Sequence, residues 1–236
     1  MSRELARRLT AELVGTAFLV TAVVGSGIAA VRLSPDDVGL QLLENSLITG
    51  AALIALILAL QPVSASFNPV VTLVERALGA ISTRDTAYLI VAQVVGGTLG
   101  TVLANLMYDL DAINLSTRDR SGGGLWLGEI VATFGLVLVV FGSLRSGRSE
   151  IVAFTVGGYI TAAYWFTSST SFANPAVTIA RMFSDTFAGI QPASVPAFVA
   201  FQVVGGALAL LLVRFLYPDT PSVELDGSTT PQESRS

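Results

Sequence analysis

The segment SFNPVVTL, residues 66–73, recurs later in the chain as FANPAVTI, residues 172–179. Each copy places an Asn-Pro pair at the start of a short apolar stretch, 68–79 and 174–183. Asn is a preferred helix N-cap, and Pro is favoured at the first helical position. At about 1.5 Å per residue such helices are roughly 15–18 Å long, half of a hydrocarbon core of about 30 Å. Two half-membrane helices are therefore predicted.

Six longer apolar stretches surround the predicted half-helices. A helix that crosses the hydrocarbon core needs about 20 residues, and most of the six come close to that length. They cover residues 9–31, 42–60, 85–108, 125–144, 151–166 and 195–217. The fifth is short and is expected to extend into neighbouring residues. Only 13% of the 236 residues are charged, against about 25% in an ordinary soluble domain, which indicates a membrane protein.

The two halves of the chain resemble each other beyond the Asn-Pro pair. QVVGG at 93–97 recurs at 202–206, and Glu12 in the first stretch is matched by Glu129 in the fourth. The matches fall in the same order in the two halves, about 9–108 and 125–217. Each half holds three full spans, so the halves have opposite orientations and form an inverted repeat. The predicted fold is an all-α membrane protein with six transmembrane helices and two half-helices.

These helices form one predicted channel domain over residues 1–217, followed by a disordered tail over 218–236 that is rich in Pro, Ser, Thr and acids. The chain has no Lys, and cytoplasmic loops carry an excess of basic residues. With the N-terminus inside, the inner arginines are Arg3, Arg7, Arg8, Arg84, Arg145, Arg148 and Arg214, and the outer ones are Arg32, Arg118 and Arg120. Both termini are therefore expected in the cytoplasm. The basic start is interpreted as part of a retained first helix, because the apolar run is longer than in a signal peptide.

Composition also excludes several classes of function. The chain has no Cys and no His, which removes disulfides, thiolate metal sites and the commonest general base. We predict no metal, no cofactor and no catalytic residue. The net charge of −4 predicts no nucleic-acid partner.

The half-helix starts themselves suggest a function. Inverted repeats bring the two Asn-Pro ends together near the middle of the membrane, where irregular backbone is tolerated if it lines a wet cavity. Each helix start carries about half a positive charge. At about 5 Å and an effective dielectric of about 20, one end repels a unit cation by roughly 1.7 kcal/mol and two ends by roughly 3 kcal/mol. The Asn amides can donate hydrogen bonds to water or a hydroxyl, so a pore for small uncharged solutes is predicted.

These features resemble the major intrinsic proteins, the aquaporins and aquaglyceroporins, over roughly residues 9–217. The resemblance implies a right-handed bundle that forms a homotetramer in a lipid bilayer, with one pore per subunit, and we expect a bacterial inner membrane. It implies that Glu12 and Glu129 are buried structural acids that hold the re-entrant loops. The pore-motif residues are Asn68, Pro69, Val70, Asn174, Pro175 and Ala176.

The chain departs from the family pattern at two positions. Val70 stands where the first motif usually has Ala, and Val177 stands where the outer constriction usually has Arg. Spacing places the other constriction residues at Thr49, Ala162 and Ser171, with no aromatic side chain in the ring. A wider, less polar pore is predicted, which passes glycerol, arsenite and methylated arsenicals. In this respect the chain is similar to bacterial aquaglyceroporins associated with arsenic resistance.

Some alternatives stay open at the level of sequence. Arg181, one helical turn after Val177, either supplies a charge at the outer mouth or binds loop carbonyls. A proton-coupled secondary transporter that uses Glu12 or Glu129 is the second candidate function, because intramembrane acids are functional candidates. An ion channel is weakened by the lack of any predicted ring of pore-lining acids. An intramembrane enzyme is weakened by the lack of His and Cys.

Overall fold

The computed structural model describes residues 2–218, and the expected tail lies outside this part of the chain except for Pro218. Two short 3₁₀ turns, η1 (Ser149–Ile151) and η2 (Pro192–Ser194), precede α6 and α8. The α-helices are α1 (Arg3–Leu33), α2 (Val38–Leu60), α3 (Pro69–Ala77), α4 (Thr83–Met107), α5 (Gly123–Arg145), α6 (Val152–Phe166), α7 (Pro175–Arg181) and α8 (Val195–Leu216). Each half thus has two helices, a half-helix of seven or nine residues and a last long helix, as the inverted repeat predicts, although α6 is shorter than its counterpart α2.

Capping residues set several helix starts earlier than hydropathy suggests. The Ser2 hydroxyl accepts a hydrogen bond from the Leu5 amide at 3.1 Å, so α1 includes the basic residues before the predicted span at 9–31. The Asp37 carboxylate caps α2 in the same way at 2.9 Å. A side-chain cap satisfies amides that the first helical turn leaves without partners, and polar residues can therefore begin these helices.

Within residues 2–218, five helices are long and apolar enough to cross a membrane: α1, α2, α4, α5 and the helix that η2 and α8 form together. The sixth predicted span corresponds to α6, which has only 15 residues. As predicted, the span extends into neighbouring residues, because η1 begins before residue 151; it does not extend at its other end, where the chain becomes extended at Thr167. It then enters the loop that leads to α7.

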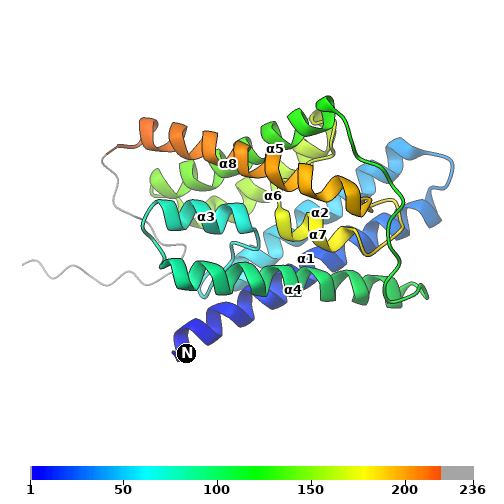
Figure 1. Cartoon of the computed structure of the whole chain (residues 1–236), viewed down its shortest axis with the longest axis horizontal. Helices are drawn as coiled ribbons and strands as arrows, with labels where there is room; N and C mark the ends of the chain where they lie inside the picture. Colours follow the sequence, from blue (N-terminus) through cyan, green and yellow to red (C-terminus); the bar gives the residue numbers. More distant parts are fainter. Residues whose placement is uncertain (1, 219–236) are drawn as a thin grey trace, which may run out of the picture.

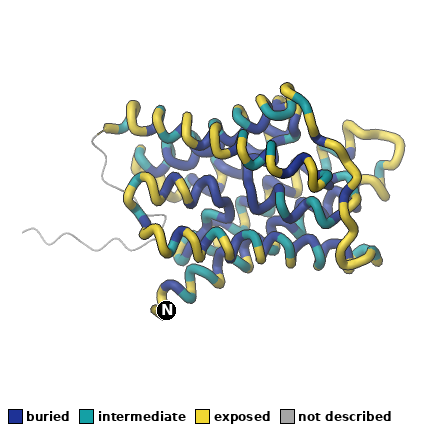
Figure 2. Tube along the Cα trace, in the orientation of Figure 1, coloured by how far each residue is buried: buried dark blue, intermediate teal, exposed yellow. Residues whose placement is uncertain are grey.

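Helices α1 and α4 lie together on one side of the molecule, and α5 and α8 lie together on the other (Figure 1). Short α3 and α7 lie between the two pairs and point toward each other. Buried residues concentrate along this middle layer, whereas exposed residues follow the outer faces and the ends (Figure 2). The outer faces carry large apolar side chains such as Phe18, Leu103 and Leu211, which is the pattern of a surface that faces lipid.

Glycines allow the close approach within each outer pair. A Cβ on Gly96 would lie 2.3 Å from the carbonyl oxygen of Leu13, and one on Gly100 would lie 2.2 Å from that of Ala17. In the second half, a Cβ on Gly205 would lie 2.5 Å from the carbonyl oxygen of Ile130. Small residues let membrane helices pack backbone to backbone. Part of the repeated QVVGG motif is therefore explained by helix packing.

Candidate functional site

The two Asn-Pro pairs begin α3 and α7 as predicted. The Asn68 side-chain oxygen accepts a hydrogen bond from the Val70 amide at 3.0 Å. The Asn174 oxygen accepts from the amides of Ala176 and Val177 at 2.9 and 3.2 Å. Both Asn residues have extended backbones, and Pro follows each at the first helical position. These are N-caps in the ordinary sense.

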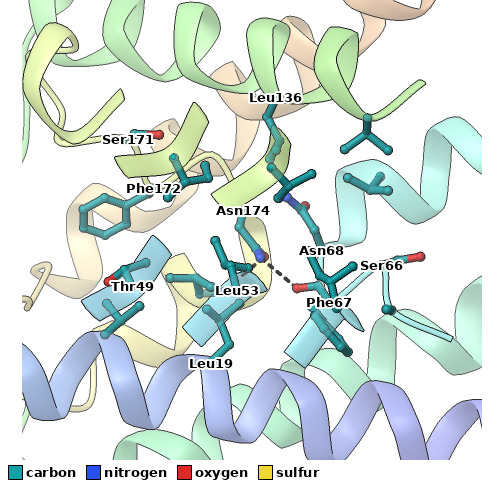
Figure 3. Close-up of a pocket in the computed structure, with 18 of the residues that line it drawn as sticks. Leu19, Thr49, Leu53, Ser66, Phe67, Asn68, Leu136, Ser171, Phe172 and Asn174 are labelled. Carbon is teal, nitrogen blue, oxygen red and sulfur yellow. Dashed lines mark hydrogen bonds between the residues drawn. The ribbon is translucent and has the colours of Figure 1, made fainter. Parts of the chain in front are cut away.

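The same two side chains also tie the halves to each other. The Asn68 amide nitrogen donates to the Ala173 carbonyl at 2.7 Å, and the Asn174 amide nitrogen donates to the Phe67 carbonyl at 2.7 Å. The second of these bonds is drawn in Figure 3. Each amide group has two hydrogens, so each retains one donor for another partner. The helix starts therefore meet head to head, as the repeat requires.

The residues that accept these bonds have unusual backbones. Phe67 and Ala173 both have φ +48°, and Thr170 and Ser171 have φ +61° and +50°. Left-handed φ values cost energy in residues other than Gly, and they persist only where surrounding contacts fix them. The loops before the two half-helices are therefore held in place by other parts of the molecule.

Glu12 provides this restraint in the first half. Its carboxylate accepts hydrogen bonds from the amides of Ser66 and Phe67 at 2.8 and 2.7 Å. It also accepts from the Ser64 hydroxyl at 2.6 Å and from the Gln93 side chain at 2.8 Å. The side chain is fully buried.

Glu129 holds the second loop in the corresponding way. It accepts from the amides of Phe172 and Ala173 at 3.0 and 2.9 Å and from the Gln202 side chain at 2.5 Å. Gln202 also donates to the Thr178 hydroxyl at 2.8 Å, as Gln93 does to the Thr72 hydroxyl at 2.9 Å. The repeated Gln thus joins each glutamate to its half-helix.

A cavity runs between the halves and passes both Asn side chains. Its volume for the centres of water-sized molecules is about 70 Å³, and one water needs about 10–15 Å³ by this measure. The wall is mostly aliphatic. On α2, for example, one helix face contributes Leu53 and Ile57 together with the polar Thr49. The polar side chains on the wall are Thr49, Gln61, Ser66, Asn68, Tyr164, Ser171, Asn174 and Arg181.

One end of the cavity contains three of the four predicted constriction residues. Thr49, Ser171 and Val177 lie on the wall together with Phe172, and Figure 3 shows Thr49, Ser171 and Phe172 around this end. The Ser171 hydroxyl is buried and has no hydrogen-bond partner among residues 2–218. Because its oxygen has almost no accessible surface, Ser171 shapes the wall but does not present its hydroxyl to a solute.

The prediction for Ala162 is wrong. Ala162 is exposed, and α6 faces the cavity with Val152, Val156, Ile160 and Tyr164. These four recur every four residues and form one helix face, whereas Ala162 is two residues from Ile160 and lies on the opposite side. The Tyr164 hydroxyl lies 3.2 Å from the Thr49 hydroxyl.

The expected absence of aromatic residues at this end is also wrong, because Tyr164 and Phe172 both line the wall. The spacing that put Ala162 on the wall missed Tyr164. The regular spacing of apolar residues along α6 was a usable signal, since it continues through Tyr164. For Phe172 the sequence carries no comparable signal, because the left-handed loop sets its direction.

Arg181 combines the two interpretations that the sequence left open, a charge at the outer mouth and a side chain that binds a loop carbonyl. Its side chain is 2% exposed and lines the cavity. Its Nε donates to the Ala188 carbonyl, and its guanidinium lies over the Phe172 ring, 3.4 Å from the centroid. The charge is therefore anchored to a loop carbonyl and still reaches the cavity wall. Within residues 2–218, no group of three or more His, Cys, Asp or Glu side chains is placed to hold a metal ion.

Comparison with known proteins gives consistent results. The family model described as major intrinsic protein matches residues 1–167. The chain is 48% identical over 230 residues to aquaglyceroporin AqpS of Rhizobium meliloti, covering 97% of each chain. It is 30% identical to the probable aquaporin AqpM of Archaeoglobus fulgidus, covering 92% of this chain and 99% of that one.

Among solved structures, the aquaglyceroporin from Plasmodium falciparum superposes with a TM-score of 0.70 at 18% identity. The match covers 91% of this chain and 98% of the other, and it supports the same helical fold. Together with the paired half-helices, the family match over more than half of the sequence shows that this multi-pass membrane protein belongs to the major intrinsic protein family.

Proposed function

We propose that the protein is a passive channel for water and small neutral solutes, with no chemical conversion of the solute. The observation that carries the proposal is that Asn68 and Asn174 cap opposed half-helices and line one cavity. Each amide has a hydrogen left to donate to a passing water or hydroxyl, and the two positive helix ends disfavour cations. The family membership supports this function.

The proposed solutes are glycerol-like molecules, including arsenite and methylated arsenicals. Position 177 is Val, so one side of the outer constriction is apolar and lacks the guanidinium usual in the family. Thr49 and Ser171 add polar residues to the wall at this end, and Phe172 adds an apolar one. Such a wall suits an uncharged solute that has both hydroxyl and apolar surface. The name aquaglyceroporin, given to the Rhizobium relative, agrees with this class.

The proposed setting is a bacterial inner membrane, in which the protein forms a homotetramer with both termini in the cytoplasm. The direct test is a permeability panel in proteoliposomes with water, glycerol, urea, arsenite and methylated arsenicals. Downhill flux of glycerol above that of protein-free vesicles is the expected result. Flux of none of these solutes would contradict the proposal.

The first prediction concerns Val177. In Val177→Arg, a long side chain with rigid donors enters the outer constriction, and glycerol and arsenite flux should fall about tenfold while water still passes, because pore width and lining donors set selectivity. Val177→Met is the matched control, since it adds length without charge or donors. Glycerol flux at the wild-type level in Val177→Arg would exclude a constriction at this position.

The second prediction concerns Tyr164. Tyr164→Ala should raise the flux of glycerol and larger polyols severalfold, because the ring that faces Thr49 is removed from the wall. Tyr164→Phe keeps the ring and should differ little in size selectivity. Ala162→Leu changes the exposed face of the same helix and should leave the solute panel unchanged. A clear fall in glycerol flux in Ala162→Leu would instead place Ala162 at the constriction, because the larger side chain would narrow it.

The proton-coupled transporter remains the second candidate, but the geometry does not favour it. It needs Glu12 or Glu129 to exchange protons with the solute path. Both carboxylates are fully buried, both accept hydrogen bonds from loop amides, and neither lines the cavity. Uphill accumulation that collapses with a protonophore would favour the transporter.

A further inference from the structure

The linker between the two halves is hydrogen-bonded to the residues that follow α7. The Ser116 amide donates to the Met182 carbonyl at 2.9 Å, and the Gln191 amide donates to the Arg118 carbonyl at 2.8 Å. The linker passes the loops around α7 along one end of the molecule (Figure 1). Residues from the linker are therefore fixed relative to the end of the cavity that contains Phe172.

Arg120 is the buried basic residue of this linker. It is 7% exposed, its amide donates to the Ser194 hydroxyl at 3.1 Å, and its Nε donates to the Gly189 carbonyl at 2.8 Å. Its guanidinium carbon lies 4.8 Å from the centroid of the Phe172 ring. Arg181 contacts the same ring at 3.4 Å. Two guanidinium groups therefore contact one aromatic ring that lines the cavity, and cation–π attraction stabilises both contacts.

Neither charge is neutralised by a salt bridge. Within residues 2–218, no carboxylate lies in salt-bridge contact with Arg120 or Arg181. Asp119 accepts a hydrogen bond from the Ser194 hydroxyl at 3.1 Å instead, and Glu129 is occupied by loop amides. Burial, and then the nearby guanidinium of Arg181, lower the pKa of Arg120, although arginine side chains stay protonated in proteins. Arg181 lines the cavity itself, and Arg120, which does not, contacts the Phe172 ring on its wall. Glu129 acts on both guanidinium groups from nearby, but two positive charges face its one carboxylate at this end of the cavity.

We propose that Arg120 is a specificity-determining residue of the channel, which acts with Arg181 through the Phe172 ring to exclude cations. The two charges take the place of the arginine that position 177 lacks. A unit charge at about 10 Å in a medium of effective dielectric about 20 changes the entry rate of a monovalent cation roughly tenfold. A neutral solute of the same shape is not affected by this field. The inference rests on the proposed channel function and specifies how its charge selectivity is achieved.

The test compares urea with guanidinium, which have nearly the same planar shape and differ in charge. Fluxes into proteoliposomes are measured for wild type and for three variants of Arg120. Arg120→Gln keeps a donor for the Gly189 carbonyl, Arg120→Met keeps an apolar stem against Phe172, and Arg120→Lys keeps the charge. Arg118→Gln is the matched control, because Arg118 lies in the same linker and contacts Phe187, but it is exposed and solvent screens its charge.

The Gln and Met variants should pass guanidinium about tenfold faster than wild type, with urea flux unchanged. The Lys variant and Arg118→Gln should match wild type. Guanidinium flux at the wild-type level in a Gln or Met variant that still passes urea would overturn the inference. Equal leakage in the Lys and Gln variants would also overturn it, since it would assign the effect to loop position and not to charge. Absence of urea and glycerol flux in wild type would instead contradict the proposed function. If either Arg120→Gln or Arg120→Met does not fold, the guanidinium flux of the other variant tests the inference.

Discussion

Glu12→Gln is expected to destabilise the protein by several kcal/mol and to abolish solute flux. The glutamate oxygens accept hydrogen bonds from two loop amides, the Ser64 hydroxyl and the Gln93 side chain. An amide of the same shape replaces one acceptor oxygen with an NH₂ group that faces donors. A buried donor without a partner costs about 1–3 kcal/mol, and bonds to a charged acceptor are worth about 1.5–3 kcal/mol each. The left-handed Phe67 that Glu12 holds would then be free to relax.

The measurement is the midpoint of thermal unfolding in detergent, together with glycerol flux. Glu150→Gln is the control, because Glu150 is exposed in η1 and the same substitution there removes only a solvated charge. Glu129→Gln should behave like Glu12→Gln, since it holds the other loop in the same way. Equal midpoints for Glu12→Gln and Glu150→Gln would show that the buried carboxylate is not a main support of the loop.

Gly100→Ala is the second substitution with a large expected effect. The new Cβ would lie 2.2 Å from the Ala17 carbonyl oxygen and 3.0 Å from its carbonyl carbon. Both atoms belong to the backbone of α1, so no side chain can move aside and the two helices must separate. Overpacking of this kind costs about 1–3 kcal/mol or more. Separation would also weaken the bond from the Thr21 hydroxyl to the Gly100 carbonyl, which is 3.1 Å long.

Gly158→Ala is the matched control for Gly100→Ala, because it makes the same substitution in another helix. Gly158 lies in α6, and a Cβ added there would have no neighbouring atom within 4 Å. Ala at this position should be neutral or stabilising by up to about 1 kcal/mol, because Gly is a poor helix former. The unfolding midpoint of Gly100→Ala should therefore fall below that of wild type, whereas that of Gly158→Ala should equal or exceed it. A Gly100→Ala protein as stable as Gly158→Ala would contradict the close packing of α1 and α4.

The sequence was sufficient to predict the architecture, for reasons that the structure makes clear. Capping and helix-start preferences depend on local residues, so Asn68-Pro69 and Asn174-Pro175 mark α3 and α7 without tertiary information. The repeat also paired Glu12 with Glu129. Helix ends were less predictable, because polar caps such as Ser2 extend helices past the apolar residues on which hydropathy depends.

The wall of the cavity could be predicted only where it lies on regular helices or close to a motif. Val177 lies three residues from its cap, and helix geometry fixes its direction. Spacing put Ala162 on the wall, but which face of α6 meets the cavity depends on its packing against α2, which spacing alone does not fix. Arg120 and Phe172 were missed because their contact joins the linker to a distant loop.

The reciprocal bonds between the two Asn side chains and the loop carbonyls have a consequence for biogenesis. Asn68 needs the carbonyl of Ala173, and the carbonyl of Phe67 needs Asn174, so the first re-entrant loop has no final partner until more than a hundred further residues have been synthesised. The first three spans can enter the bilayer during translation, but the permeation path cannot mature then. Its last step must be post-insertional, when the newly made second half docks and closes both bonds at once.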